Sequence, residues 1–310
     1  MIGLPIYAVA FLLIALVAGN NVTVCVGTAI AGRIISRKAG IVIAAVGYTA
    51  GFLIGGGLLQ WGVVQLLSAS GQGFVFVAIL VSALVFAAAH LLRVPQSFSI
   101  VLTMSLLGID LADSGIPNLG FAVLVIGYWI GAMVVTAALV IALLRYSYRT
   151  LRDRSVWPTV SRIRITIIAV SFLASFTFGA NTIGLAYATL SVESGNSAYL
   201  LATVIAAAIF GSIALSGGEL RRIGNEIIAL RYLNAAITQS VSVLIVGIAT
   251  VFSIPISTAQ TFTAGMYGAS LSYKTRLVLK KPLVSIIATW TGTAIASLIL
   301  SFAVTKLLLA

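Results

Sequence analysis

The chain has 310 residues, of which 61% are hydrophobic and 8% are charged, whereas a soluble domain has about 45–50% apolar and about 25% charged residues. This composition excludes a soluble protein and predicts a chain that crosses the membrane several times. A membrane β-barrel is excluded as well, because its strands alternate polar and apolar residues and the apolar runs here are continuous. The expected fold class is an all-α polytopic membrane protein.

Ten apolar segments are candidates to cross or enter the membrane, where a full span needs about 20 residues. They lie near residues 4–31, 40–66, 73–92, 95–109, 118–145, 164–191, 197–218, 233–253, 255–272 and 282–308. The first segment has no basic flank before its apolar run, which favours a spanning helix over a cleaved signal peptide. The fourth and ninth segments are short and open on Pro95 and Pro255. We expect both to be half-helices or re-entrant pieces that line a cavity.

The basic residues predict the orientation of the chain. They lie mostly between apolar runs, so the net charge of +12 indicates membrane orientation and nucleic acid is not an expected partner. If the ten segments alternate in direction, the basic clusters all fall on one side, which the positive-inside rule assigns to the cytoplasm. The acidic residues Asp110, Asp113 and Glu193 and both termini then fall on the other side. Lys306 lies in the last apolar run and is expected to reach an interface.

A polar, arginine-rich linker at residues 146–163 divides the chain into two similar halves, 1–145 and 164–310. Asn181 follows Asn20 by 161 residues, and Pro255 follows Pro95 by 160. Because each half has about five membrane segments, an odd number, the second half enters the membrane from the opposite face. The sequence therefore predicts two inverted-topology repeats with broken or re-entrant helices, which is the architecture of alternating-access transporters.

Residues 95–99 (PQSFS) and 255–260 (PISTAQ) form the first pair of repeated motifs. Proline suits the first turn of a helix, because its missing N–H would be unpaired there anyway. The free N–H groups and the positive end of the dipole make a helix N-terminus an anion site. Two such ends, facing each other, would hold a tetrahedral oxyanion without an arginine. The alternative is that the Ser and Thr hydroxyls only cap kinked helices.

Residues 19–23 (GNNVT) and 179–183 (GANTI) form the second pair, and each is a polar island inside an apolar run. A buried amide without a partner costs roughly 2–7 kcal/mol, so both islands are expected to face a shared polar cavity. An asparagine carbonyl can ligate a cation, and its amide can donate to an anion. The alternative is a contact between neighbouring helices, worth around 1 kcal/mol in membranes.

The two motif pairs, in this order and duplicated, resemble the inorganic phosphate transporter (PiT) family, which carries G-x-N-D-V-A-N and then P-V-S-T-T-H in each half. The resemblance spans nearly the whole chain and implies a phosphate transporter. Asn21 and Thr182 replace the family's aspartates, which are the natural ligands of a coupling sodium ion. Ile100 and Gln260 replace its histidine. The resemblance therefore identifies a divergent member, to which cation coupling does not transfer directly.

The function expected from these patterns is a membrane transporter for inorganic phosphate that works by alternating access, with the anion held between half-helix N-termini at mid-membrane. The candidate substrate-binding residues are Asn20, Asn21, Ser97, Ser99, Asn181, Thr182, Ser257, Thr258 and Gln260. A coupling Na⁺ or H⁺, if one is used, has as candidate ligands or titrating groups Asn20, Thr23, Asn181 and His90, of which only the histidine titrates near neutrality.

Two alternatives stay open. One is a permease of the same fold for sulfate or another oxyanion, because hydroxyls and helix ends do not by themselves distinguish tetrahedral anions. The other is a transport-inactive membrane receptor or scaffold, favoured by the missing aspartates. The sequence shows no nucleophile–base pair, so an enzyme is not expected, and neither is a cofactor. The expected partners are phosphate or a similar oxyanion, the lipid bilayer of the plasma membrane, and a second copy of the chain in a homodimer.

Overall fold

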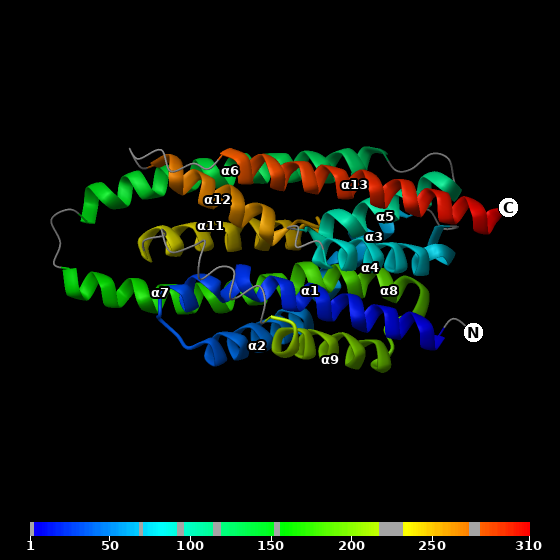
Figure 1. Cartoon of the computed structure of the whole chain (residues 1–310), viewed down its shortest axis with the longest axis horizontal. Coiled ribbons are helices and arrows are strands. Elements are labelled where there is room, and N and C mark those ends of the chain that lie inside the picture. The colour runs from blue at the N-terminus through cyan, green and yellow to red at the C-terminus, as the bar shows by residue number, and fades with distance from the viewer. Residues whose placement is uncertain are drawn as a thin grey trace.

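The structure is a computed structural model that describes residues 3–67, 71–91, 96–113, 119–151, 156–216, 232–272 and 280–310. Within these ranges the chain is helical and has no strand (Figure 1). The first half contains α1 (Gly3–Ala31), α2 (Arg37–Gly55), η1 (Gly56–Leu59), α3 (Gln60–Leu66), η2 (Gly71–Phe74), α4 (Val75–Leu91), α5 (Phe98–Asp113) and α6 (Leu119–Leu151). The second half contains α7 (Val156–Phe178), η3 (Gly179–Ile183), α8 (Gly184–Ser194), α9 (Ala198–Ala214), α11 (Tyr232–Val251), α12 (Thr258–Ser272) and α13 (Lys280–Leu309).

Six helical stretches in the described part of the chain are long and apolar enough to cross a membrane. They are Pro5–Ala31, Arg37–Leu66, Gly120–Thr150, Ser161–Ser194, Tyr232–Val251 and Ile286–Leu309. The other predicted segments are shorter helices, since α4 and α9 have 17 residues each, α5 has 16 and α12 has 15. The ten predicted segments thus correspond to helices, but four of them are too short to count as full spans.

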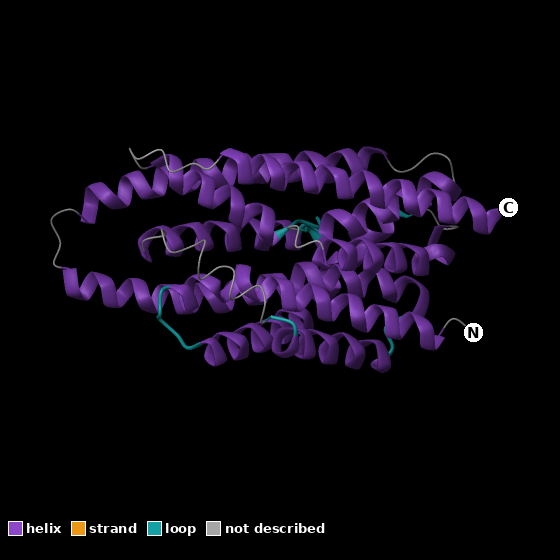
Figure 2. Cartoon of the chain, in the orientation of Figure 1, coloured by secondary structure: helices purple, strands orange, loops and turns teal. Residues whose placement is uncertain are grey.

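The two helix pairs α4–α5 and α11–α12 occupy opposite halves of the long axis. In Figure 1, α4 and α5 lie in the half that also holds both termini, and α11 and α12 lie in the other half. The loop that leads into α12 lies near the middle of the molecule (Figure 2). Each pair packs within itself. The arrangement is that of two hairpins whose turns point toward each other.

Two boundaries differ from the sequence-based expectations. The helices α6 and α7 extend into the predicted linker, to Leu151 and from Val156, because a helix can continue past the bilayer where its arginines are solvated. The helix α12 begins at Thr258 and not at Pro255, since the Ser257 side chain caps its first turn. Pro95 lies outside the described residues.

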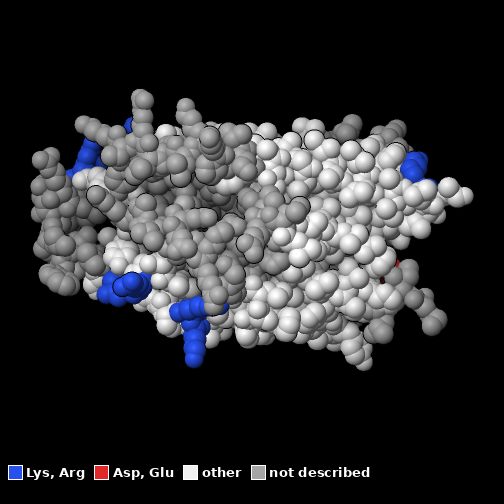
Figure 3. Space-filling model, viewed as in Figure 1, with Lys and Arg blue, Asp and Glu red and all other residues white. Residues whose placement is uncertain are grey.

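The charges separate along the long axis. Figure 3 shows most of the described Lys and Arg at the end opposite to the termini, with one basic group near the C-terminal end, where the chain carries Lys306 four residues before its last residue. Both termini lie at the same end of the molecule (Figure 1). This distribution agrees with the predicted orientation, in which the basic end faces the cytoplasm.

Glycines allow α2 to cross the segment α7–η3 at backbone contact. A Cβ on Gly51 would overlap the backbone of Phe176, and a Cβ on Gly179 would overlap that of Tyr48. Helices in membranes associate largely through such close packing of small residues. The Tyr48 ring then packs on the Phe178 ring, with 4.6 Å between their centroids. This crossing fixes the position of the second polar motif.

Candidate functional site

The two hairpins present similarly capped helix tips. The Ser97 hydroxyl accepts the Ile100 backbone N–H at 3.5 Å, at the start of α5. The Ser257 hydroxyl accepts the Gln260 backbone N–H at 3.2 Å, at the start of α12. Each serine is thus an N-cap that satisfies one of the first four N–H groups of its helix. The hydroxyl hydrogen of a capping serine stays available as a donor to a ligand.

The two tips meet each other inside the protein. The Ser99 hydroxyl, in the first turn of α5, donates to the Ile256 carbonyl oxygen at 3.1 Å. The indole Nε1 of Trp129 on α6 donates to the Pro255 carbonyl oxygen at 2.7 Å. Ser97 and Ser257 are 2% and 4% exposed, so neither tip points into lipid. The structure therefore places Ser99 of the first tip beside Ile256, the residue that precedes Ser257 of the second tip.

Asn181 holds the loop that precedes α12. Its amide nitrogen donates to the Thr250 hydroxyl at 2.9 Å and to the Ile254 carbonyl oxygen at 3.2 Å. Its amide oxygen accepts the Ile256 backbone N–H at 3.1 Å. Both amide hydrogens are thereby used, and one lone pair is left for any ligand. The predicted binding residue Asn181 acts first as a support for the second tip.

Asn181 lies in a π-helical turn, which the structure places at Gly179–Ile183 between α7 and α8. A π-turn widens the helix by one residue, and such turns occur frequently at functional sites. The widening turns Asn181 toward the end of α11 and the following loop, where its three partners lie. All five residues of the turn are buried.

The first polar motif is arranged differently, inside the regular helix α1. The Asn21 amide nitrogen donates to the Val17 carbonyl oxygen at 2.9 Å, within its own helix. Asn20 is only half-buried. The Thr23 hydroxyl, and the Thr182 hydroxyl of the second motif, are buried and have no partner among the described residues. The two motifs are therefore related in sequence and not in their hydrogen bonds.

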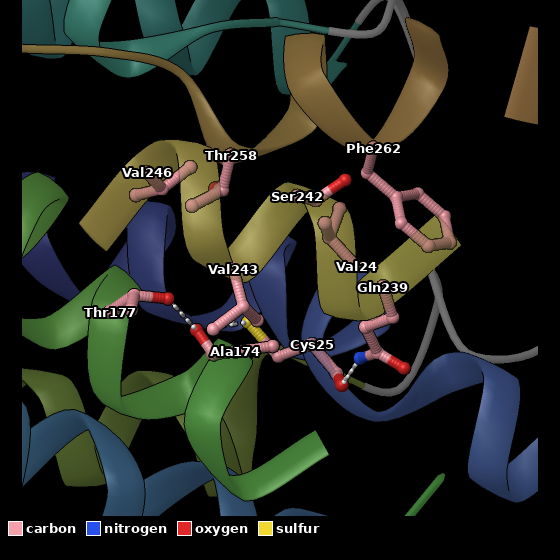
Figure 4. Close-up of a pocket in the computed structure, with 10 residues that line it drawn as sticks. All are labelled: Val24, Cys25, Ala174, Thr177, Gln239, Ser242, Val243, Val246, Thr258 and Phe262. Atoms are coloured by element: carbon pink, nitrogen blue, oxygen red, sulfur yellow. Dashed lines mark hydrogen bonds between the residues drawn. The ribbon is translucent and has the colours of Figure 1, made fainter. Parts of the chain in front are cut away.

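A small cavity of about 20 Å³, room for about one water molecule, adjoins the tip of α12 and lies between α1, α7, α11 and α12 (Figure 4). Its lining consists of Val24, Cys25, Ala174, Thr177, Gln239, Ser242, Val243, Val246, Thr258 and Phe262. Thr258 is the one predicted binding residue in this lining. The sequence analysis missed Gln239 and Ser242, because both lie in α11 outside the repeated motifs.

Gln239 organises the wall of this cavity. Its amide oxygen accepts the Thr28 hydroxyl at 2.8 Å, and its amide nitrogen donates to the Cys25 carbonyl oxygen. The Cys25 thiol in turn donates to the Ala174 carbonyl oxygen at 3.7 Å. By contrast, the Ser242 hydroxyl is buried without a partner among the described residues. The wall thus links α1, α7 and α11, and leaves one hydroxyl free.

Two buried glutamines flank the tips. Gln260, which the sequence assigned to the site, is 4% exposed, and Gln96, which it did not assign, is 5% exposed. The only sequence signal for Gln96 is a polar residue inside a repeated motif. The backbone of His90 belongs to α4, but its side chain lies outside the described residues. In the described part of the chain no three His, Cys, Asp or Glu side chains form a metal-binding group.

Comparisons with known proteins agree with the motif pairs. The family model PHO4, phosphate transporter family, matches residues 149–301. A protein of Methanocaldococcus jannaschii named "Putative phosphate permease MJ0630" is 26% identical over 302 residues, which are 97% of this chain and 96% of the relative. A solved structure titled "The sodium-dependent phosphate transporter" has 14% identity and a TM-score of 0.87 over 98% of both chains, and it shows a shared fold. The chain is therefore an integral membrane protein that shares the fold of this solved transporter and is similar to the phosphate transporter family over residues 149–301.

Proposed function

We propose that the chain transports inorganic phosphate across the plasma membrane by alternating access. The observation that carries the proposal is the meeting of the two helix tips, at the hydrogen bond from Ser99 to the Ile256 carbonyl. Helix N-termini bind anions through free N–H groups and the helix dipole. The match to the phosphate transporter family and to a relative named as a phosphate permease supports phosphate as the substrate.

The packing of the helices supports the inverted repeats on which alternating access depends. Each contact of a helix in one half has a matching contact of the equivalent helix in the other half. Thus α5 packs on α13, and its equivalent α12 packs on α6. In the same way, α1 packs on α9 while α7 packs on α2, and α4 packs on α1 while α11 packs on α7. The second helix of each hairpin therefore packs against the other half of the chain. We place the anion site at the interface between the two halves.

Within this site the tips supply the donors. The hydroxyls of Ser97, Ser257 and Thr258, with the free N–H groups of the two first turns, donate to the anion, while the Ser99 hydroxyl joins the first tip to the second. Asn181 keeps the second tip in place through its three hydrogen bonds. Asn20, Asn21 and Thr182 remain candidates from α1 and η3, and the Thr182 hydroxyl, which has no partner among the described residues, is proposed as a further donor.

We propose that any coupling sodium ion is bound weakly. Asn20, Thr23 and Asn181 offer neutral oxygens, and hard cations such as Na⁺ prefer charged ones. His90 is the only histidine of the chain and is our candidate for a proton-carrying group. We expect uptake to depend less on a sodium gradient than it would with the two aspartates that the family motif carries at the positions of Asn21 and Thr182.

Uptake of radiolabelled phosphate by proteoliposomes tests the proposal. We expect uptake by the wild type, and a loss of about tenfold or more in Ser99→Ala, since that change removes a donor between the tips. Ser272→Ala is the matched control, because Ser272 lies at the far end of α12 and bonds only to the Ala269 carbonyl of its own helix. Wild-type vesicles that take up sulfate and no phosphate would instead identify the second candidate, a sulfate permease.

A further inference from the structure

Two glutamine side chains are buried at the tips without the partners that their burial demands. Gln96 immediately precedes the capping Ser97, and Gln260 lies in the first turn of α12, three residues after the capping Ser257. Both amide atoms of Gln96 and the amide oxygen of Gln260 have no hydrogen-bond partner among the described residues. An amide buried in this way costs about 1–3 kcal/mol unless it is paired. A ligand that hydrogen-bonds to these amide groups would therefore stabilise both side chains.

Both glutamines belong to the helix tips that form the proposed anion site. The bond from Ser99 to Ile256 joins the first turn of α5 to the residue just before the Ser257 cap. Gln96 stands just before the Ser97 cap of the first tip, and Gln260 lies in the first turn of the second tip. Each tip thus brings one amide to the junction of the hairpins.

The chemistry of these amides distinguishes one anion from another. An amide oxygen only accepts hydrogen bonds, so it needs a ligand that donates. Phosphate carries protons at neutral pH and donates them from its P–OH groups, whereas sulfate carries none. The tips present no Lys or Arg among the described residues 96–100 and 254–261, and a site without a cation favours a monoanion over a dianion, which costs more to desolvate.

We propose that Gln96 and Gln260 are the specificity-determining residues of the site, and that they select dihydrogen phosphate by accepting its two P–OH protons. The proposal rests on the proposed function and deepens it, because it names the ionic form that is carried. One bound phosphate would then supply a hydrogen-bond donor to the amide oxygens of both residues. The amide hydrogens of Gln96 are donors for the remaining phosphate oxygens.

The test compares phosphate uptake with competition by excess sulfate in proteoliposomes. With total phosphate held constant, wild-type uptake is expected to be faster at about pH 6 than at about pH 8, because the monoanion predominates below the second ionisation of phosphate near neutrality. Gln96→Met and Gln260→Met keep the size of the side chain and remove the acceptor. Each is expected to lower the preference for phosphate over sulfate by about tenfold, as the loss of one hydrogen bond implies.

The matched control is Gln60→Met, since Gln60 is half-buried and bonds at 3.0 Å to Asn196 outside the hairpins. We expect this variant to keep the wild-type preference. The two tip variants should also melt at the same or a higher temperature than the wild type, because methionine relieves an unpaired amide. A loss of discrimination then cannot come from misfolding.

The outcomes separate the two proposals. Phosphate uptake with an unchanged phosphate-to-sulfate ratio in both Met variants, or with faster uptake at high pH, would overturn the role of the glutamines and leave phosphate transport standing. No phosphate uptake by the wild type at either pH would overturn the proposed function and this inference with it.

Discussion

At the scale of single residues, the clearest contrast is between the asparagines of the two motifs. Asn181 makes three hydrogen bonds to residues of α11 and the loop before α12. Asn21 makes one, to the carbonyl of Val17 in its own helix. Similar sequence motifs thus perform different structural tasks, and their removal should have different effects.

We expect Asn181→Ala to destabilise the protein by about 2–4 kcal/mol, because it leaves a buried N–H and a buried carbonyl unpaired. Asn21→Ala should cost about 1 kcal/mol or less, since one bond within a helix is lost. Thermal unfolding in detergent measures both changes. Equal shifts in melting temperature would contradict the supporting role of Asn181.

The sequence indicated which residues stand at the helix tips, but not their hydrogen-bond partners. It identified the serines at both tips, because a Pro-x-Ser pattern inside an apolar run has few interpretations. It did not predict the bonds of Asn181, since Ile256 is 75 residues away and its N–H is left free only by the loop. Gln96 was missed for a related reason: its importance comes from burial without a partner, which no sequence pattern encodes.

At the scale of helices, the crossing of α2 with α7 and η3 depends on glycine. A Cβ at Gly179 would overlap the Tyr48 backbone. We expect Gly179→Ala to cost about 1–3 kcal/mol, the usual penalty for overpacking. The matched control is Gly127→Ala on α6, where nothing lies within 4 Å of an added Cβ, and the change should stabilise by up to about 1 kcal/mol. Thermal unfolding of both variants in detergent checks the difference, and a stable Gly179→Ala would refute the backbone contact.

The cavity beside the tip of α12 yields a prediction for α11. Ser242→Leu overfills this small space while removing a buried hydroxyl without a partner among the described residues, so the folded state should lose about 1–3 kcal/mol through overpacking. If the tip needs the space to move, phosphate uptake should fall by about tenfold or more, which corresponds to a small rise in a barrier.

Ser240→Leu is the control for this change, because Ser240 lies two residues away on the same helix and does not line the cavity. Uptake in vesicles and melting temperature are compared for both variants. Normal transport by Ser242→Leu would show that the cavity plays no part in the transport cycle.

The π-turn at Gly179–Ile183 could not be predicted from sequence. Its residues have no preference for that geometry, and the turn arises where α7–α8, a single stretch of helix, bends around α2 and the hairpin loop. Likewise, the extension of α6 and α7 into the predicted linker depends on how far the helices project past the bilayer, which charge alone does not determine.

At the scale of the whole molecule, the separation of charge predicts which end is exposed to the cytoplasm. In a Cys25→Ser background, a cysteine at Arg37 should be hidden from an impermeant thiol reagent applied outside cells, and a cysteine at Lys306 should react. Arg37 and Lys306 are both exposed and lie toward opposite ends of the molecule. Labelling in the reverse pattern would invert the proposed orientation.

The membrane class, the near-repeat of the two halves and the meeting of the tips were accessible from sequence, because composition and a nearly constant offset record them directly. Which helices span fully was not, since α4 and α11 both form one arm of a hairpin, yet α4 has 17 residues and α11 has 20, and only α11 is long enough to cross a membrane.

The three bonds of Asn181 have a mechanical consequence. Through Asn181 one hairpin is hydrogen-bonded to the neighbouring helix of its own half, whereas Asn21, in the corresponding motif of the other half, bonds to the backbone of its own helix. The two hairpins then differ in how rigidly they are held. If the chain alternates as we propose, opening toward the termini and opening toward the basic end would have unequal energy costs, and one of the two open states would be more populated even without a gradient.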